Sequence, residues 1–519
     1  MRKQKWLAWL MIMIMGLSCL VGCSGSGNDS DKKKGDASEI RIKYWNSGLR
    51  EEWLNAVIDS FEKAHPEYTV KVESSASSTA VASTFGLADI DETDLYLCVK
   101  QYNTDDSLEP LDDVLDATVD GESMTIREKF QDSYLALETE SDGHVYNLTY
   151  GGGIVGIYYN KAMFEKQGIK QAPRTTNELL DVCDTLYSAE IPAFCHFQTI
   201  GYWEDNMIPV FFAQYDGLDY VLNNFFGCTD EEGNSPSKNV FTKKDGRYEA
   251  LKVLESVITP EYTMEGSNTY DHTTVQTMWL QGEACMMVNG TWITSEMSSV
   301  SDMADFAMMR TPVVSSIIDK LATVKKDSEL RKIVSAIDRV TDGEAELSEY
   351  QQGDSYVVDG ITVSAADWDY IKAARNTMAI NATGNSAYIP KYADNIEGAK
   401  EFLKYLYSDE GYTIYANTLE QTLPLSLSKG ELDIKKWSDI SQQQAHIFDT
   451  TEQFISLFNA SAHDIFKYGG ATWKGDIRTY CNRFCSRNNS ERWTTDEVWE
   501  QIEKNVNDYY EAAWLENIK

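Results

Sequence analysis

The stretch Thr277–Trp292, TMWLQGEACMMVNGTW, joins the end of a helix, a strand and a turn. Its first residues are expected to close a helix, because Gly282 stands where a left-handed C-terminal cap is needed. Ala284–Val288 is wholly apolar, which is typical of a strand covered on both faces. The turn that follows places Trp292 just past the carboxyl end of this strand, where open α/β sheets bind ligands. Trp292 is therefore a candidate platform for an amphipathic ligand, and packing in a core or lid is the alternative role.

Upstream, strand and helix patterns alternate. The expected strands are Ile40–Trp45, Thr69–Val72 and Asp94–Val99. The first two are separated by a helical stripe, which implies a mostly parallel sheet flanked by helices. Trp45 and Asn46 then lie at the carboxyl end of one strand, and Gln101 and Tyr102 follow another, so both loops face the same crevice. For Trp45, a role in the core at the strand end is the alternative.

A glycine-rich segment marks the passage to a second lobe. Gly151–Gly156 contains a formal G-x-G-x-x-G pattern, but it runs into the β-type residues Ile157–Tyr159, so a dinucleotide site is rejected. Such a segment suits a chain that crosses between lobes and permits hinge motion. Farther on, Ala193–Phe197 is an expected strand, and the loop after it carries Tyr202 and Trp203.

The N-terminal sequence is typical of an export signal. Basic residues at 2, 3 and 5 precede an apolar run from Trp6 to Leu20, too short for a comfortable membrane span. Leu20–Cys23 is similar to a bacterial lipobox, in which the cysteine is lipidated after cleavage; an ordinary secretory signal with an incidental cysteine is the alternative. Several acyl chains on Cys23 would hold the protein at a membrane. Ser24–Ser38 is expected to be a flexible tether.

Composition excludes several classes of function. The formal net charge of −36 argues against nucleic acid as a partner. The odd number of cysteines left in the mature chain argues against a disulfide framework. Motifs for ATP, zinc proteases and serine hydrolases are absent from the sequence, and the six histidines are scattered. We therefore expect no enzyme activity, no cofactor and no metal site.

Several segments together resemble one known family. The lipobox, Tyr159–Lys161 (YNK), Glu283–Trp292 and Ala399–Gly411 (AKEFLKYLYSDEG) are similar to segments of carbohydrate-binding lipoproteins of ABC importers, the maltose-binding-protein-like family. The resemblance implies a two-lobed, type II periplasmic-binding-protein-like α/β fold joined by hinge crossovers. Maltose itself is not expected as ligand, because glycines 151–153 occupy a place where maltose binders present a carboxylate.

The resemblance also implies a division of the chain. Residues 1–22 form the lipoprotein signal peptide, 23–38 the tether, 39–150 and 382–422 lobe 1, and 151–381 and 423–519 lobe 2. Residues 313–378 are interpreted as a helical insertion in lobe 2, with helix candidates at 317–324, 328–340 and 367–377. The ligand would be held by aromatic and polar side chains from both lobes. These are Trp45, Asn46, Gln101, Tyr102, Tyr202, Trp203, Trp292 and Trp473, with the choice between Tyr202 and Trp203 open and an internal packing role as the alternative for Trp473.

The implied function is capture of a sugar or oligosaccharide outside the cell. A monomer, lipid-anchored at Cys23, would deliver it to the transmembrane subunits of an ABC permease served by a separate ATPase. A ligand shifts a hinge equilibrium only through its differential affinity, so it must contact both lobes. A secreted carbohydrate-active hydrolase and a glycan-binding adhesion or sensor lipoprotein are the alternatives.

Overall fold

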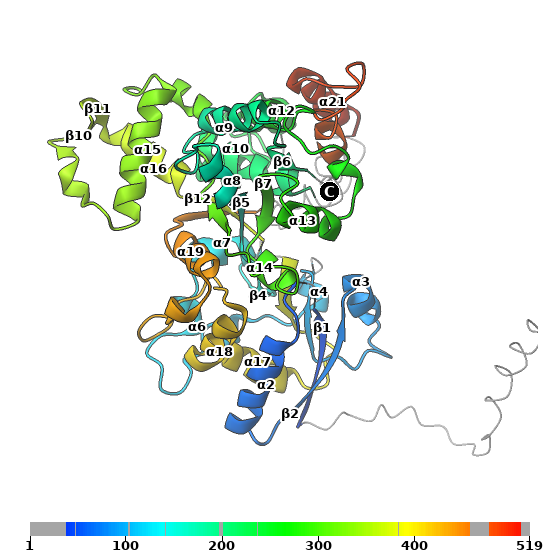
Figure 1. The fold of residues 1–519 in the computed structure, drawn as a ribbon. Helices are drawn as coiled ribbons and strands as arrows, with labels where there is room; N and C mark the ends of the chain where they lie inside the picture. Colours follow the sequence, from blue (N-terminus) through cyan, green and yellow to red (C-terminus); the bar gives the residue numbers. More distant parts are fainter. Residues whose placement is uncertain are drawn as a thin grey trace, which may run out of the picture. The chain divides into compact units, whose positions relative to one another are not determined.

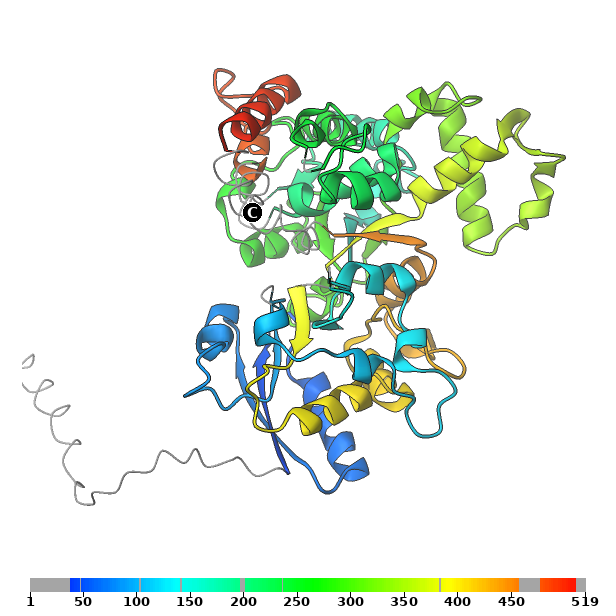
Figure 2. The ribbon, with the colours of Figure 1, turned by 180° about the vertical axis from the view of Figure 1, so that it is seen from behind.

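The computed structural model describes residues 38–46, 48–101, 104–140, 142–196, 201–235, 237–381, 384–456 and 477–509. These residues belong to one compact unit, Ala37–Lys519, which contains two large α/β lobes (Figures 1 and 2). The lipidation candidate Cys23 and the site candidates Tyr102 and Trp473 lie outside the described residues. Of the helices within the described ranges, none is long and apolar enough to cross a membrane.

The first lobe is built on a five-stranded sheet in the order β2-β1-β3-β13-β4. The strands are β1 (Glu39–Trp45), β2 (Thr69–Ser75), β3 (Leu95–Cys98), β4 (Leu148–Gly151) and β13 (Asn385–Tyr388). Its longer helices are α2 (Glu52–Ala64), α7 (Asp132–Glu138), α17 (Ile396–Leu406) and α18 (Asp409–Leu419). In α2, apolar residues at helical spacing, among them Trp53, Val57 and Phe61, form the buried stripe that holds the helix on the sheet.

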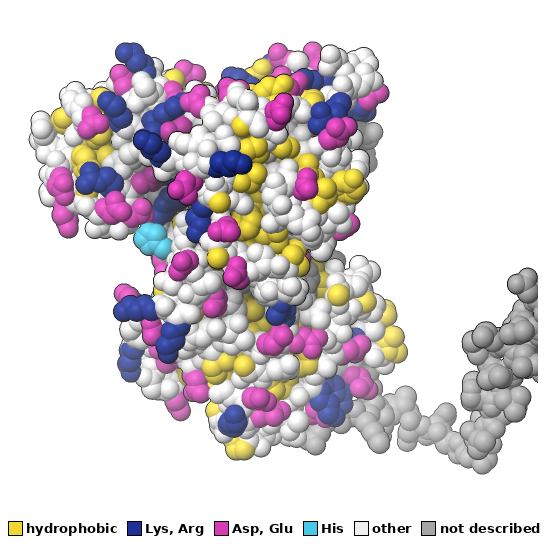
Figure 3. All heavy atoms as spheres, in the orientation of Figure 1, with side chains coloured by type: hydrophobic (Ala, Val, Ile, Leu, Met, Phe, Trp, Pro, Cys, Tyr) yellow, Lys and Arg dark blue, Asp and Glu magenta, His cyan; other side chains and the backbone are white. Residues whose placement is uncertain are grey.

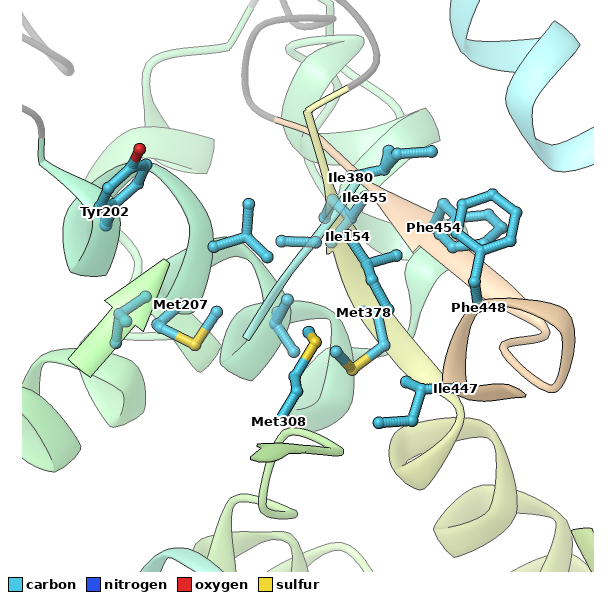
Figure 4. Close-up of a cluster of buried hydrophobic side chains, with 14 of the residues drawn as sticks. Ile154, Tyr202, Met207, Met308, Met378, Ile380, Ile447, Phe448, Phe454 and Ile455 are labelled. Carbon is cyan, nitrogen blue, oxygen red and sulfur yellow. The ribbon is translucent and has the colours of Figure 1, made fainter. Parts of the chain in front are cut away.

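The second lobe is built on a sheet in the order β14-β12-β5-β7-β6, with β8 also paired to β5. The strands are β5 (Ile154–Asn160), β6 (Phe194–Cys195), β7 (Met286–Gly290), β8 (Phe306–Met309), β12 (Thr377–Ile380) and β14 (Gln453–Ile455). Its longer helices are α9 (Thr176–Ser188), α10 (Ile208–Asp216), α12 (Gly246–Val257), α13 (His272–Leu280), α19 (Asp439–Asp449) and α21 (Thr495–Tyr509). Figure 4 shows Ile154, Ile380 and Ile455 from three neighbouring strands packed together in its core.

The expectation of mostly parallel sheets is wrong in detail, because both sheets are mixed. Strand β1 is parallel to β2 and β3, but β13 is antiparallel to both β3 and β4. Likewise β5 is antiparallel to β7, β8 and β12. The reason is the crossing of the chain between the sheets. It leaves the first lobe through β4 and β5 and returns through β12 and β13, so the outgoing and returning strands run in opposite directions.

The third crossing comes later than the expected boundary at residue 423. The Pro424 carbonyl accepts a hydrogen bond from the Gln131 backbone N–H at 3.0 Å, and Leu425 forms a β-bridge with Phe130. The Ser428 hydroxyl donates to the Asp409 carboxylate at 2.7 Å. The chain therefore stays on the first lobe beyond Leu423, before α19 and β14 join the second.

The segment between β8 and β12 is not purely helical, which corrects the expected helical insertion at 313–378. It contains α15 (Asp327–Thr341) and α16 (Ala365–Arg375), but a small antiparallel sheet lies between them. Its strands are β9 (Gln351–Gln352), β10 (Ser355–Val358) and β11 (Ile361–Ser364). The turn Asp359-Gly360 has positive φ at both residues, 49° and 81°. This backbone geometry suits a tight hairpin between β10 and β11, which are rich in β-branched side chains. Near residues 317–324 the structure has only a short 3-10 turn, Ser315–Asp319.

All seven cysteines of the described residues are buried, and none of them is joined in a disulfide. Burial raises the pKa of the Cys485 thiol to about 11 and that of Cys98 likewise to about 11. Thiols that are both buried and protonated are poor nucleophiles and act as small apolar side chains. This agrees with the expectation that disulfides do not hold the fold.

Candidate functional site

The turn after β7 positions Trp292 as expected. Helix α13 ends at Leu280, and Gly282 follows with a φ of +85°. The Trp292 indole lies directly against Gly290. A methyl group on Gly290 would be only 2.1 Å from the ring. The ring is partly buried, and Trp292 starts the short helix α14 (Ile293–Glu296). Only glycine at position 290 lets the indole approach the strand this closely.

The loop after β6 brings Tyr202, and not Trp203, to this indole. The ring centroids of Tyr202 and Trp292 are 6.0 Å apart at an interplanar angle of 42°. Trp203 is only 2% exposed and packs edge-on against Phe194, with centroids 5.2 Å apart. Trp203 is therefore a core residue in this structure, whereas the ring of Tyr202 lies next to that of the ligand candidate Trp292.

The first lobe reaches the same indole through the loop that follows β1. A methyl group on Gly48 would lie 3.7 Å from the Trp292 Cδ1 atom, and the Arg50 guanidinium donates to the Ser298 hydroxyl. Trp45 itself is partly buried in the first lobe, and its indole N–H donates to the Ala76 carbonyl at 3.1 Å. Trp45 is thus held beside its own sheet, and the loop behind it makes the contact between the lobes.

The polar candidates of the first lobe are fixed by neighbouring loops. The Asn46 side-chain amide donates to Glu51 Oε1 at 3.0 Å. The Gln101 backbone N–H donates to Asn147 Oδ1 at 3.3 Å, and Asn147 Nδ2 donates back to the Gln101 carbonyl at 3.2 Å. This reciprocal pair fixes the backbone at the end of β3 and leaves the Gln101 side chain partly exposed.

Beside the aromatic pair lies a buried polar cluster that sequence reasoning missed. It is carried by Trp203–Met207, a π-helical turn of the kind often found at functional sites. Glu204 is 1% exposed, and neither carboxylate oxygen has a hydrogen-bond partner among the described residues. Burial raises its pKa to about 8. Its neighbour Asp205 forms an ion pair with Arg478. The sequence gives no signal for this cluster, because acidic residues are too numerous for one pair to stand out.

The first two crossings between the lobes meet at Gly153, and Gln421 of the first lobe lies beside them. The Asn381 N–H, on the second crossing, donates to the Gly153 carbonyl at 3.0 Å. Gln421, which follows α18 and precedes the third crossing, donates through Nε2 to the Thr291 hydroxyl at 3.0 Å. A methyl group at Gly153 would lie 1.4 Å from that hydroxyl and 2.9 Å from Gln421 Nε2. The turn that carries Trp292 is therefore in direct contact with the segments about which the lobes would move.

The described residues contain no group of three or more histidine, cysteine or acidic side chains arranged to hold a metal ion.

Acidic and basic side chains are interspersed over the face of the molecule shown in Figure 3. A site with buried and partly buried aromatic rings next to short polar side chains suits an uncharged ligand that presents both apolar faces and hydroxyl groups.

Two mixed sheets joined by three crossings, with aromatic rings beside the crossings, define the class of two-lobed solute-binding proteins. The chain belongs to the bacterial extracellular solute-binding protein family, whose model matches residues 46–413. A binding protein of Brucella abortus (strain 2308) is 24% identical over 299 residues, which are 56% of this chain. The chain spans 65% of the length of that relative.

Solved structures support the same fold. A chitin oligosaccharide binding protein superposes with a TM-score of 0.59 and 14% identity, covering 91% of this chain and 99% of that one. The solute-binding protein RafE in complex with raffinose superposes with a TM-score of 0.57 and 14% identity over the same shares. The two-lobed, type II fold expected from the sequence is thereby confirmed.

Proposed function

We propose that this protein captures a sugar or oligosaccharide outside the cell and delivers it to the permease of an ABC importer. The observation that carries the proposal is the arrangement around Trp292. Its indole lies next to Tyr202 of its own lobe, with ring centroids 6.0 Å apart, and beside Gly48 of the other lobe, where an added methyl group would be 3.7 Å from the indole Cδ1 atom. Aromatic faces next to hydrogen-bonding side chains suit a sugar ring, and the two fold relatives bind chitin oligosaccharide and raffinose.

The proposed ligand-binding residues follow from this arrangement and from the family resemblance. Trp292 and Tyr202 supply the aromatic platform, and Asn46, Gln101 and the loop after Trp45 supply contacts from the first lobe. Tyr102 and Trp473 are proposed as further contacts on the resemblance alone. The hinge at Gly153 lets the lobes close on a ligand that touches both, because only differential affinity shifts such an equilibrium.

We also propose that the chain is anchored at the outer face of the membrane through acyl groups on Cys23, with residues 24–38 as tether. Cys23→Ala should release the protein into the medium, whereas the parent chain partitions with membranes. Retention of the variant on membranes, measured by fractionation, would exclude the anchor and leave sugar binding untouched.

Binding is tested by a thermal-shift screen of mono- and oligosaccharides followed by calorimetry, because a ligand of the native state raises its melting temperature. Trp292→Ala should weaken binding by about 1–3 kcal/mol, by analogy with base–aromatic stacking. Trp493→Ala is the matched control, since Trp493 also pairs with a tyrosine, Tyr480, at 5.6 Å but in a different part of the lobe. Equal affinity of the Trp292 variant and the parent would remove Trp292 from the site, and release of reducing ends from the oligosaccharide would indicate a hydrolase.

A further inference from the structure

The short helix α14, which begins directly after Trp292, is tied to α13 by one carboxylate. Glu296 ends this helix, and its backbone N–H donates to the Trp292 carbonyl at 2.9 Å. Because α14 is a single helical turn, contacts with other elements and not its own hydrogen bonds decide where it lies. The contacts of the Glu296 side chain therefore bear on the position of the Trp292 indole.

Two residues of α13 contact the Glu296 carboxylate. Gln276, which is fully buried, donates through Nε2 to Glu296 Oε2 at 2.8 Å. His272 Nε2 lies 3.7 Å from the other oxygen, Oε1. The two residues are four positions apart in α13 and so lie on the same face of the helix. One partner of Glu296 is thus always neutral, whereas the other carries a charge only when it is protonated.

His272 changes its charge near neutral pH because of its neighbours. Among the described residues, the carboxylates that act on it are Glu296 of α14 and Asp271 of α13 itself. The interaction with Glu296 raises the pKa of His272 above its ordinary value of 6.5, although partial burial opposes the rise. The imidazolium is therefore present at acidic pH, and its attraction to Glu296 is lost as the pH rises through this raised pKa.

Other charged or titratable groups flank α14. The Arg50 guanidinium of the first lobe donates to the hydroxyl of Ser298, just beyond Glu296. On the side of the aromatic pair, burial and then the negative charge of Glu296 raise the pKa of the Tyr202 phenol. Glu296 therefore acts on both aromatic residues, on Trp292 through the backbone of α14 and on Tyr202 through space.

We propose that Glu296 is a positioning residue for the Trp292 platform and that protonation of His272 strengthens its hold, so that sugar affinity falls as the pH rises. The inference rests on the proposed function and adds a regulation of the same site. Coupling of this kind is reciprocal, so a sugar that binds the positioned platform favours the protonated histidine. A partly exposed ion pair supports a change in affinity of about two- to fivefold.

The first test measures the affinities for raffinose and for N,N′-diacetylchitobiose by calorimetry at about pH 5.5 and about pH 8.5. The parent should bind about two- to fivefold more tightly at the lower pH. His272→Gln, which is neutral at both, should lose this difference, and Glu296→Gln should lose it too while it keeps a hydrogen-bond acceptor. His144→Gln is the matched control, because His144 pairs with Asp112 at 3.0 Å in the first lobe.

The comparison between parent and variants decides, because the carboxyl of Glu204 also titrates over this range and contributes equally to all of them. If His272→Gln keeps the parent's ratio of the two affinities, the pH dependence does not come from His272. The proposal is then wrong, while sugar binding stands. Circular dichroism and melting temperatures establish that the variants are folded.

A second measurement needs no sugar. In protein labelled with 5-fluorotryptophan, the fluorine resonance of Trp292 is identified by its loss in Trp292→Phe. It should shift with pH in the parent, with a midpoint above 6.5, and stay in place in His272→Gln and Glu296→Gln. A resonance that is constant in the parent, or that shifts equally in the variants, would exclude the positioning role. If the parent binds neither sugar, the proposed function fails for these sugars, and the fluorine shift alone decides on Glu296.

Discussion

The side-chain amide of Gln421 donates a hydrogen bond to the hydroxyl of Thr291 over 3.0 Å, and both groups are buried. Gln421 lies in the first lobe just after α18, whereas Thr291 precedes Trp292 in the turn after β7 of the second lobe. Gly153 of the first crossing lies against both residues. The ligand platform and the hinge are consequently parts of one packed contact, so a change at either should be felt at the other.

Gly153→Ala tests this contact. The new methyl group would lie 1.4 Å from Thr291 Oγ1, so the turn must move, and we expect the free energy of unfolding to fall by about 1–3 kcal/mol. Gly156→Ala, in the strand β5 that follows Gly153, is the control. Its methyl group meets chiefly the flexible end of Met308, at 2.5 Å, so it should cost less. Denaturant melts give both values, and a larger loss for Gly156→Ala would contradict this account of the contact.

Tyr202 and Trp203 should respond differently to truncation. Trp203→Ala empties a core position against Phe194 and should lower the free energy of unfolding by about 3–5 kcal/mol. Tyr202→Ala should affect stability less and weaken sugar binding, because Tyr202 contacts Trp292. Chemical denaturation and calorimetry on both variants check this. Normal sugar affinity in Tyr202→Ala would show that the tyrosine only supports the indole.

The loop that carries Gln101 depends on a buried ion pair. Lys100 is 4% exposed and its ammonium group lies 2.9 Å from Glu138 Oε2. Lys100→Met leaves that carboxylate buried without its partner and should destabilise the protein by about 3–5 kcal/mol. The double variant Lys100→Met/Glu138→Leu should recover part of the loss, because Glu140 Oε1, 3.6 Å from the ammonium group, still loses its cation. A double variant as unstable as the single one, measured by urea unfolding, would mean that the pair is not the cause.

Glu204 predicts a specific pH dependence of stability. Burial raises the pKa of its carboxyl to about 8, above the ordinary value of 4.5 that it regains on unfolding. Between these values the folded state holds a proton that the unfolded state releases, so this group makes stability fall as the pH rises, by up to about 1.4 kcal/mol per pH unit. Glu204→Gln should remove this fall and be more stable than the parent at pH 8.

Thermal melts across pH 4.5–8 measure the effect. Glu283→Gln, at an exposed position, makes the same chemical change without burial and should follow the parent curve. If Glu204→Gln keeps the pH slope of the parent, the carboxyl is not protonated in the folded state.

Much of the fold could be predicted because its signals are local. The apolar run before Asn289 and the cap at Gly282 depend on residues close in sequence, and β7 and α13 formed within two residues of the expectation. The mixed sheets could not be predicted in this way, because strand direction at β12 and β13 depends on how the chain returns between the lobes. The Asp359-Gly360 dipeptide is a hairpin signal in the sequence. The strands on either side are short and lie between charge-rich helices, so the segment was interpreted as helical.

The candidate site was harder to predict for the same physical reason. Position at a strand end made Trp292 a candidate, and the family resemblance made Tyr202 and Trp203 candidates, but adjacency in sequence did not separate Tyr202 from the core residue Trp203. Side-chain direction there depends on a π-helical turn that periodicity does not reveal. The burial of Glu204 arises from packing against residues that are distant in the sequence, which one sequence does not show.

The buried thiols have a practical consequence. Because the seven cysteines of the described residues are buried, maleimide dyes should react preferentially with cysteines introduced on the surface. One dye on an exposed position such as Glu67 and another on Glu283 would then report distance changes between the two lobes by energy transfer. Opening and closing could be followed in single molecules while every native cysteine of the folded core stays in place.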